Sequence, residues 1–160
     1  MVHAYEFELI EKEGGFLVIP RDFEGATSGE TLREAYEMAA DWLKLAIEHC
    51  AIHGLPLPEP TFGNDPANGG KVVIIAVDAG LHTVPRMTAA EAARALGVSP
   101  SRVSHMIRDG KLESFKHGHN TWVSRYHVEA ILSSPRRPGR PKMARTVTSA
   151  INQDDFHVIQ

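Results

Sequence analysis

The feature that most constrains the fold is Gly97, which stands between two segments with helix-start signals. Residues 88–91 (TAAE) have the spacing of a capping box, in which the first and last side chains bond each other's backbone N–H groups. Gly97 can take the left-handed conformation that ends a helix in a sharp turn. Ser99 can then cap a second helix that has Pro100 at its first position. The sequence therefore predicts two short helices joined by a tight turn.

The apolar residues around this turn have the spacing of a helix-turn-helix. A small residue, Ala93, is followed by Gly97 four positions later and by the β-branched Val103 six positions after that. On a helix over 100–109, polar side chains that can bond base edges or phosphates point outward. They are Ser101, Arg102, Ser104, His105 and Arg108. The alternative is a structural helical hairpin whose outer face is only solvated.

A β-hairpin is predicted directly after the second helix. Residues 113–116 and 121–124 read as two short strands around a turn at 117–120 (HGHN). Ser124 is then placed to cap a further helix that carries Val128 on its apolar side. The expected order is thus helix, turn, helix, hairpin, helix.

Residues 87–132, MTAAEAARALGVSPSRVSHMIRDGKLESFKHGHNTWVSRYHVEAIL, closely resemble the excisionase/MerR-like winged helix-turn-helix family. The resemblance implies that the second helix enters the major groove and that the hairpin is a wing near the DNA backbone. The residues it adds to the predicted DNA-binding set are Lys111, Lys116, His117 and His119. A Cro-like all-helical domain is the competing assignment, and the hairpin sequence around Trp122 speaks against it.

The two halves of the chain carry opposite charge. Residues 1–80 hold 5 Lys/Arg and 14 Asp/Glu, a net −9, whereas residues 81–160 hold 12 and 6, a net +6. A basic half suits nucleic acid, because phosphate neutralisation releases counterions. An acidic half repels nucleic acid but complements a basic protein surface. Two units with different partners are therefore expected.

Composition excludes several classes of protein. Apolar residues make up 42% of the chain, which argues against general disorder, and no apolar run approaches the roughly 18 residues of a membrane span. The single cysteine, Cys50, excludes an internal disulfide and a four-cysteine zinc site. The first residues lack the apolar core of a signal peptide. We expect a cytoplasmic protein without a membrane partner.

The C-terminal segment 133–160 is predicted to be a basic, flexible tail. Residues 138–142 (PGRPK) resemble an AT-hook, although Pro138 stands where the first arginine of that motif belongs. Insertion into the minor groove, contact with phosphates and a solvated tail all remain open. The tail residues assigned to DNA binding are Arg137, Arg140 and Lys142.

The N-terminal half reads as strands around one long helix. Residues 4–10 alternate in polarity and, with a second strand at 16–19, predict a hairpin. A capping box at 31–34 starts an amphipathic helix that ends near Gly54, with Glu48 on its polar face. Residues 72–77 (VVIIAV) are apolar enough for a strand buried on both faces. We predict an α+β chain whose parts are a domain at 1–78, a linker at 79–86, a domain at 87–132 and a tail at 133–160.

Three groups of residues in this half resemble the HicB antitoxin family: FLVIP at 16–20, GETLREA at 29–35 and PLPEP at 56–60. The resemblance implies a partial ribonuclease H-like sheet and a partner, a small basic HicA-type toxin that cleaves mRNA. It further implies that the antitoxin covers the toxin's RNA-binding and active surface, and that an attached DNA-binding domain represses the operon. Residues 20–25 are one residue longer than the family's turn and lack its second proline.

Toxin contacts are assigned to the loop after the second strand. It offers two acids, Asp22 and Glu24, and between them Phe23 as an exposed aromatic anchor. The alternative places Phe23 in the core. A rival function is a stand-alone transcriptional regulator whose N-terminal domain senses a ligand. Winged domains act in pairs on symmetric half-sites, so a homodimer or a higher homo-oligomer is expected.

Enzymatic activity is not expected. Nuclease chemistry of the ribonuclease H type needs several carboxylates around two metal ions. Glu6 and Glu8 are predicted to face solvent, and residues 72–77 contain no acid. His49 and His53, four apart on the helix, could hold zinc, but no third ligand is evident on that face. We predict neither a metal nor a cofactor.

Overall fold

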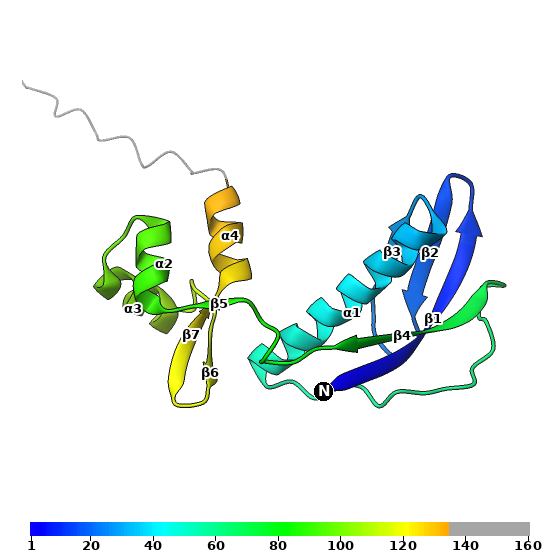
Figure 1. Cartoon of the computed structure of the whole chain (residues 1–160), viewed down its shortest axis with the longest axis horizontal. Coiled ribbons are helices and arrows are strands. Elements are labelled where there is room, and N and C mark those ends of the chain that lie inside the picture. Colours follow the sequence, from blue (N-terminus) through cyan, green and yellow to red (C-terminus); the bar gives the residue numbers. More distant parts are fainter. Residues whose placement is uncertain (135–160) are drawn as a thin grey trace, which may run out of the picture.

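The computed structural model describes residues 1–134, which form two units joined by a short ordered segment (Figure 1). The N-terminal unit (residues 1–78) contains β1 (Val2–Lys12), β2 (Gly15–Pro20), β3 (Thr27–Gly29), α1 (Leu32–His53) and β4 (Lys71–Asp78). The C-terminal unit (residues 86–134) contains β5 (Arg86–Met87), α2 (Ala89–Leu96), α3 (Pro100–Arg108), β6 (Ser114–His117), β7 (Asn120–Ser124) and α4 (Arg125–Ser133). The predicted tail contacts Arg137, Arg140 and Lys142 lie outside the described residues.

The N-terminal unit is a four-stranded antiparallel sheet with α1 packed on one face (Figure 1). The strand order is β3-β2-β1-β4, and β1 and β2 form the predicted hairpin. Phe7 lies opposite Val73, and Tyr5 opposite Ile75, on the sheet face that α1 covers. The mixed α and β composition that the sequence predicts is confirmed.

Helix α1 begins and ends where the sequence predicts. Thr31 accepts a hydrogen bond from the backbone N–H of Glu34, and Gly54 takes the left-handed conformation at φ 63°. Four residues at helical spacing bury this helix against the sheet: Ala35, Ala39, Leu43 and Ile47. One prediction was wrong, because Glu48 is buried, with only 1% of its surface exposed, rather than on the polar face.

Strand β4 also differs from the prediction. It is an edge strand, paired only with β1 among the strands of the N-terminal unit. Its side chains alternate in burial, so Ile75 is buried while Ile74 on the opposite face is 59% exposed. A continuous apolar run suggested burial on both faces, but α1 covers one face only, and the loop at 63–70 folds over the neighbouring β1.

The C-terminal unit has its own small core. Gly97 ends α2 at φ 66°, and the buried Ala93 and Val103 lie between α2 and α3. Strands β6 and β7 form the predicted hairpin, which β5 extends into a sheet of order β5-β7-β6. Ser124 precedes α4 as predicted, but its hydroxyl is buried and makes no capping hydrogen bond.

The segment predicted to be a linker is packed against both units. Ala79 and Val84 are buried, and Pro85 accepts a backbone hydrogen bond from Arg125 at the start of α4. Thr83 bonds Glu48 of α1. Within residues 1–134, no helix is both long and apolar enough to cross a membrane.

Candidate functional site

The outer face of α3 presents the predicted polar side chains. Ser99 accepts a hydrogen bond from the N–H of Arg102 (3.1 Å), and Pro100 occupies the first turn, so this helix begins where the sequence indicates. Val103 is fully buried and orients the helix on its core. The outward residues are all exposed: Ser101, Arg102, Ser104, His105 and Arg108. The structure therefore brings five hydrogen-bonding side chains to one helix surface.

The two arginines of α3 stand in different surroundings. The guanidinium of Arg108 can only donate, so Nδ1 of His105, 2.6 Å from Nη2, is the acceptor. Nε of Arg108 also lies 3.6 Å from a carboxylate oxygen of Asp109. The guanidinium of Arg102, in the first turn, takes part in none of the hydrogen bonds or ion pairs found within residues 1–134. Arg102 is thus free to reach a ligand, whereas Arg108 is held near the end of the helix.

The β6–β7 hairpin carries the other predicted DNA contacts. Lys116 and His119 are exposed and His117 is half-buried, while Lys111 is exposed between α3 and the hairpin. The indole N–H of Trp122 donates to the carbonyl of His117 (3.3 Å) and stiffens the turn. Figure 1 shows this hairpin extending away from α4.

Arg86 is a cation that the sequence did not single out. Its guanidinium carbon lies 5.0 Å from the ring centre of Trp122, a cation–π distance. One of its terminal nitrogens, Nη1, is buried without a hydrogen-bond partner within residues 1–134. Pairing of β5 with β7 places this residue, and no local motif predicts that pairing.

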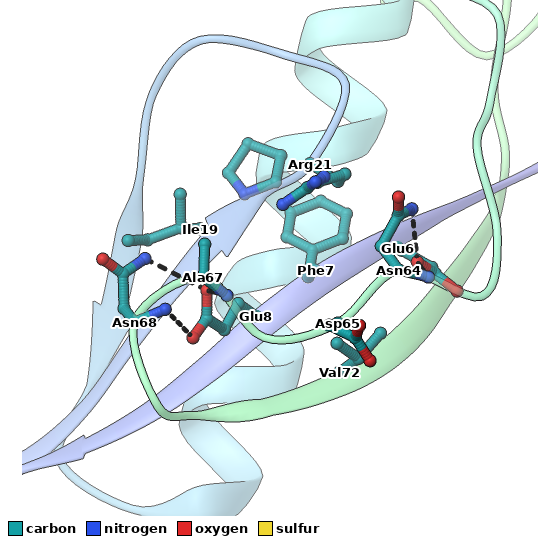
Figure 2. A pocket seen from close by; sticks show the side chains of 11 residues that line it. Glu6, Phe7, Glu8, Ile19, Arg21, Asn64, Asp65, Ala67, Asn68 and Val72 are labelled. Carbon is teal, nitrogen blue, oxygen red and sulfur yellow. Dashed lines mark hydrogen bonds between the residues drawn. The ribbon is translucent and has the colours of Figure 1, made fainter.

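The prediction that Glu6 and Glu8 face solvent was wrong. Both side chains are buried beneath the loop at 63–70 (Figure 2). Glu6 accepts hydrogen bonds from the N–H of Gly63 (2.6 Å), the N–H of Asn64 (3.1 Å) and the Asn64 amide (2.8 Å). These hydrogen bonds lower the pKa of the Glu6 carboxyl, and the bond from the Asn64 side chain has the largest effect.

Glu8 is held in the same way one pleat further along β1. It accepts from the N–H groups of Ala67 (3.1 Å), Asn68 (2.7 Å) and Gly70 (3.0 Å) and from the Asn68 amide (3.0 Å). Burial raises the pKa of Glu8, but these four hydrogen bonds outweigh it and the net shift is downward. The two carboxylates therefore fasten the loop to the sheet. Within residues 1–134 no three His, Cys, Asp or Glu side chains are arranged to hold a metal ion.

The loop assigned to toxin contact is only partly as predicted. Phe23 is half-buried rather than exposed, with its ring edge-on to Tyr5 (4.8 Å between centres) and to Trp42 (5.8 Å). Asp22 accepts from the N–H (2.9 Å) and hydroxyl (2.8 Å) of Thr61. Glu24 is exposed. Asp22 and Phe23 anchor the loop, and Glu24 is its outward charge.

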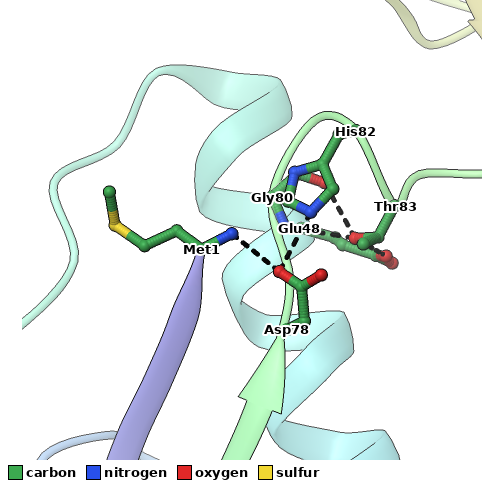
Figure 3. Close-up of polar contacts among 6 residues, drawn as sticks. All are labelled: Met1, Glu48, Asp78, Gly80, His82 and Thr83. Atoms are coloured by element: carbon green, nitrogen blue, oxygen red, sulfur yellow. Dashed lines mark hydrogen bonds and ion pairs between the residues drawn. The ribbon is translucent and has the colours of Figure 1, made fainter.

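A polar junction joins the two units around Glu48. Thr83 donates to one carboxylate oxygen of Glu48 (2.6 Å), and the phenol of Tyr126 in α4 donates to the other (3.1 Å). Figure 3 shows that Thr83 lies in the turn that follows Asp78 at the end of β4. The Asp78 carboxylate makes hydrogen bonds with the Met1 amino group and with His82. Burial, followed by the Glu48 charge, raises the pKa of Tyr126.

A groove of about 650 Å³ lies beside this junction. Its walls are Trp42, Leu45, Ala46, Glu48, His49, Ile52, Glu113 and Tyr126. At its rim Nε2 of His53 lies 3.0 Å from a carboxylate oxygen of Glu113, and the rings of His49 and His53 are 4.4 Å apart. His53 thus has a partner in Glu113, the residue just before β6, which helical spacing alone could not reveal.

Comparison with known proteins identifies a family for the C-terminal unit only. A family model described as a helix-turn-helix domain matches residues 86–134. No curated protein sequence matches the chain significantly. One solved structure, described as a toxin–antitoxin complex from Streptococcus pneumoniae, is similar with a TM-score of 0.42 and 22% identity, over 69% of this chain and 100% of that chain. The family match shows that residues 86–134 are a helix-turn-helix DNA-binding domain.

Proposed function

We propose that this protein is the antitoxin of a type II toxin–antitoxin pair and the repressor of its own operon. The observation that carries the proposal is the attachment of a helix-turn-helix, with an exposed polar face on α3, to a sheet unit of strongly acidic composition. The first half of the chain has a net charge of −9 and the second half +6. One protein with two such surfaces can bind DNA and a basic protein at once.

The DNA-binding role is assigned to α3 and to the β6–β7 hairpin acting as a wing. In this assignment α3 lies in the major groove, where Arg102 reads base edges. Arg108 contacts phosphate, because its position at the end of the helix and its bonds to His105 and Asp109 favour the groove wall. Lys116 and His119 on the hairpin contact the adjacent backbone.

The N-terminal unit is assigned to the toxin, of the HicA type that the HicB resemblance implies. A surface that binds RNA must be basic, and a domain of opposite charge covers it with favourable steering. In this proposal the loop at 22–24 contacts the toxin, and Glu24 is the residue that touches it. Phe23 and Asp22 support the loop from behind. The fold is assigned to the partial ribonuclease H-like class, without catalysis.

The proposal is tested with the gene product that neighbours this gene, if it is a basic protein of about 60–80 residues. The two proteins are co-expressed, co-purified and assayed for RNA cleavage with and without this chain. We expect a stable complex in which cleavage is suppressed, and a DNA fragment from upstream of the operon that binds the complex in a mobility-shift assay. Unsuppressed cleavage in the presence of excess chain would reject the antitoxin role.

A stand-alone regulator with a ligand-sensing domain is the second candidate, and the groove beside Glu48 favours it. That groove has apolar walls from Trp42, Leu45 and Ile52 and touches both units, as a sensor site would. A regulator of this kind would bind its operator without any partner protein and would release it when a small molecule filled the groove. Thermal-shift screening of the isolated chain against metabolite mixtures, followed by DNA binding, separates the two candidates.

A further inference from the structure

Strand β4 presents an unpaired and unusually apolar edge. It is eight residues long and is an edge strand of the sheet, whose strand order is β3-β2-β1-β4. Between its charged ends, Lys71 and Asp78, every residue is apolar (VVIIAV). Natural proteins protect such edges with a central lysine, a proline, a bulge or a covering element. Within residues 1–134 no other strand pairs with this edge, and the strand has no lysine or proline between its ends.

The backbone groups along this edge point away from the molecule. The N–H of Ala79 donates to the carbonyl of Met1, which continues the β1–β4 pairing by one residue. In an antiparallel pair, alternate residues of a strand turn their N–H and C=O groups toward the neighbouring strand, and the residues between them turn these groups away. Val73, Ile75 and Val77 therefore bond toward β1. The N–H and C=O groups of the three intervening residues face outward: Val72, Ile74 and Ala76.

The side chains of the same three residues lie on the sheet face opposite α1. Ile74 is directly opposite Glu6, and Val72 is opposite Glu8, so each pair shares a face. The loop at 63–70 covers Glu6 and Glu8, whereas Ile74 remains 59% exposed and Ala76 is exposed. The edge and the face beside it thus form one continuous apolar surface at β4.

We infer that a second copy of this chain pairs with β4 in an antiparallel manner, so that two sheets become one of eight strands. A two-fold axis at Ile74 places Val72 of one copy opposite Ala76 of the other, and Ile74 opposite its own counterpart. All outward backbone groups of the three residues are then paired. This strand is complementary to itself, because the pairing buries only apolar side chains at its centre.

The charges at the strand ends permit this pairing. With the axis at Ile74, Lys71 of one copy lies opposite Val77 of the other and Asp78 lies opposite Gly70, so no like charges meet across the two strands. Each β4 leads at Asp78 toward its own C-terminal unit. The pairing therefore places the two DNA-binding domains at opposite ends of the shared sheet, available for two half-sites.

The inference is tested by measuring the mass of the full chain in solution by light scattering during gel filtration. We expect Ile74→Lys to halve the mass of the assembly, because the substitution opposes two like charges at the two-fold axis. Leu55→Lys, at a residue 50% exposed outside the sheet, is the matched control and should keep the wild-type mass. A monomeric wild type, or an unchanged mass for a folded Ile74→Lys, would overturn the inference.

A second measurement does not depend on any substitution at Ile74. Hydrogen exchange of the wild type at high and low concentration should show that dilution deprotects the outward amides of Val72, Ile74 and Ala76 more than those of β1. Protection that is independent of concentration would overturn the inference. Protection that vanishes only when residues 135–160 are deleted, or that needs a partner protein, would overturn it as well, since another occupant would then cover the edge.

Discussion

The phenol of Tyr126 donates a 3.1 Å hydrogen bond to a carboxylate oxygen of Glu48, 78 positions earlier in the chain. Glu48 belongs to α1 of the N-terminal unit and Tyr126 to α4 of the DNA-binding domain. The other oxygen of Glu48 accepts from Thr83 in the connecting segment (2.6 Å). Glu48 itself is only 1% exposed, and an unpaired carboxylate at such a buried position is costly. One side chain therefore ties the helix, the connection and the DNA-binding domain together.

Tyr126→Phe should loosen the two units without unfolding either one. It removes one of two hydrogen bonds to Glu48 at a cost of about 1–3 kcal/mol. The measurement is the rotational correlation time of each unit from NMR relaxation, which we expect to become unequal in the variant. Tyr36→Phe, at an exposed tyrosine of α1, is the control and should leave the two times equal. Equal times in Tyr126→Phe would show that apolar contacts alone fix the orientation.

The contrast between Gly97 and Glu48 shows what the sequence could predict. The helix ends at Thr31, Gly54, Gly97 and Ser99 depend on residues within one turn, so local spacing predicts them correctly. The outward face of α3 follows from the same spacing. The burial of Glu48 depends instead on a residue of α4, and helical periodicity places it with the solvated charges.

Errors at Phe23 and Ile74 have the same physical origin. Acidic neighbours suggested that Phe23 is exposed, but Tyr5 and Trp42, distant in sequence, enclose its ring. Six consecutive apolar residues suggested that the strand at 72–77 is buried on both faces, but cover on each face depends on the whole sheet, and Ile74 of the edge strand β4 is 59% exposed. Periodicity describes one element and carries no information about the element that packs against it.

Stability should fall in acid because of Glu6 and Glu8. Both pKa values are lower in the folded protein than the ordinary 4.5. Their contribution is therefore complete above about pH 4.5 and is lost as the pH falls through the folded values. We expect the melting temperature to drop steeply below about pH 4.5. In the double variant Glu6→Gln and Glu8→Gln, melting should be lower at neutral pH and less dependent on pH.

Glu11→Gln is the matched control for this experiment, because Glu11 is exposed on the same strand. It should retain the steep acid transition of the wild type. Melting is followed by circular dichroism at constant ionic strength between pH 3 and pH 7. A double variant with the same acid slope as the wild type would assign the transition to other carboxylates, among which Asp78 and Glu91 also have lowered pKa values.

Arg102→Ala and Arg108→Ala should affect DNA binding in different ways. Loss of a base contact by Arg102 costs about 1–3 kcal/mol on the selected sequence and little on random DNA. Loss of a phosphate contact by Arg108 weakens binding to all sequences and reduces the salt slope by about 1. The measurement is fluorescence anisotropy with DNA selected by the wild type from a random pool, at several salt concentrations. An unchanged ratio of specific to random binding in Arg102→Ala would remove Arg102 from base readout.

Phe23→Ala and Glu24→Gln should separate support of the loop at 22–24 from its proposed contact with the partner. Phe23→Ala removes a half-buried ring that meets Tyr5 and Trp42 edge-on, so we expect a loss of about 2–4 kcal/mol in the free energy of unfolding. Glu24 is exposed and contributes little to folding. Its loss should instead slow association with a basic partner, and most at low salt, because screening shortens electrostatic steering to about 8–10 Å at physiological salt.

Urea titration of the isolated chain measures the first effect, and association rates with the purified partner at two salt concentrations measure the second. Glu11→Gln serves again as the control, since it removes one negative charge from an exposed site outside the loop. It should slow association less than Glu24→Gln does. If both glutamines slow association equally, the overall charge of the N-terminal unit steers the partner, and the loop at 22–24 is not its docking site.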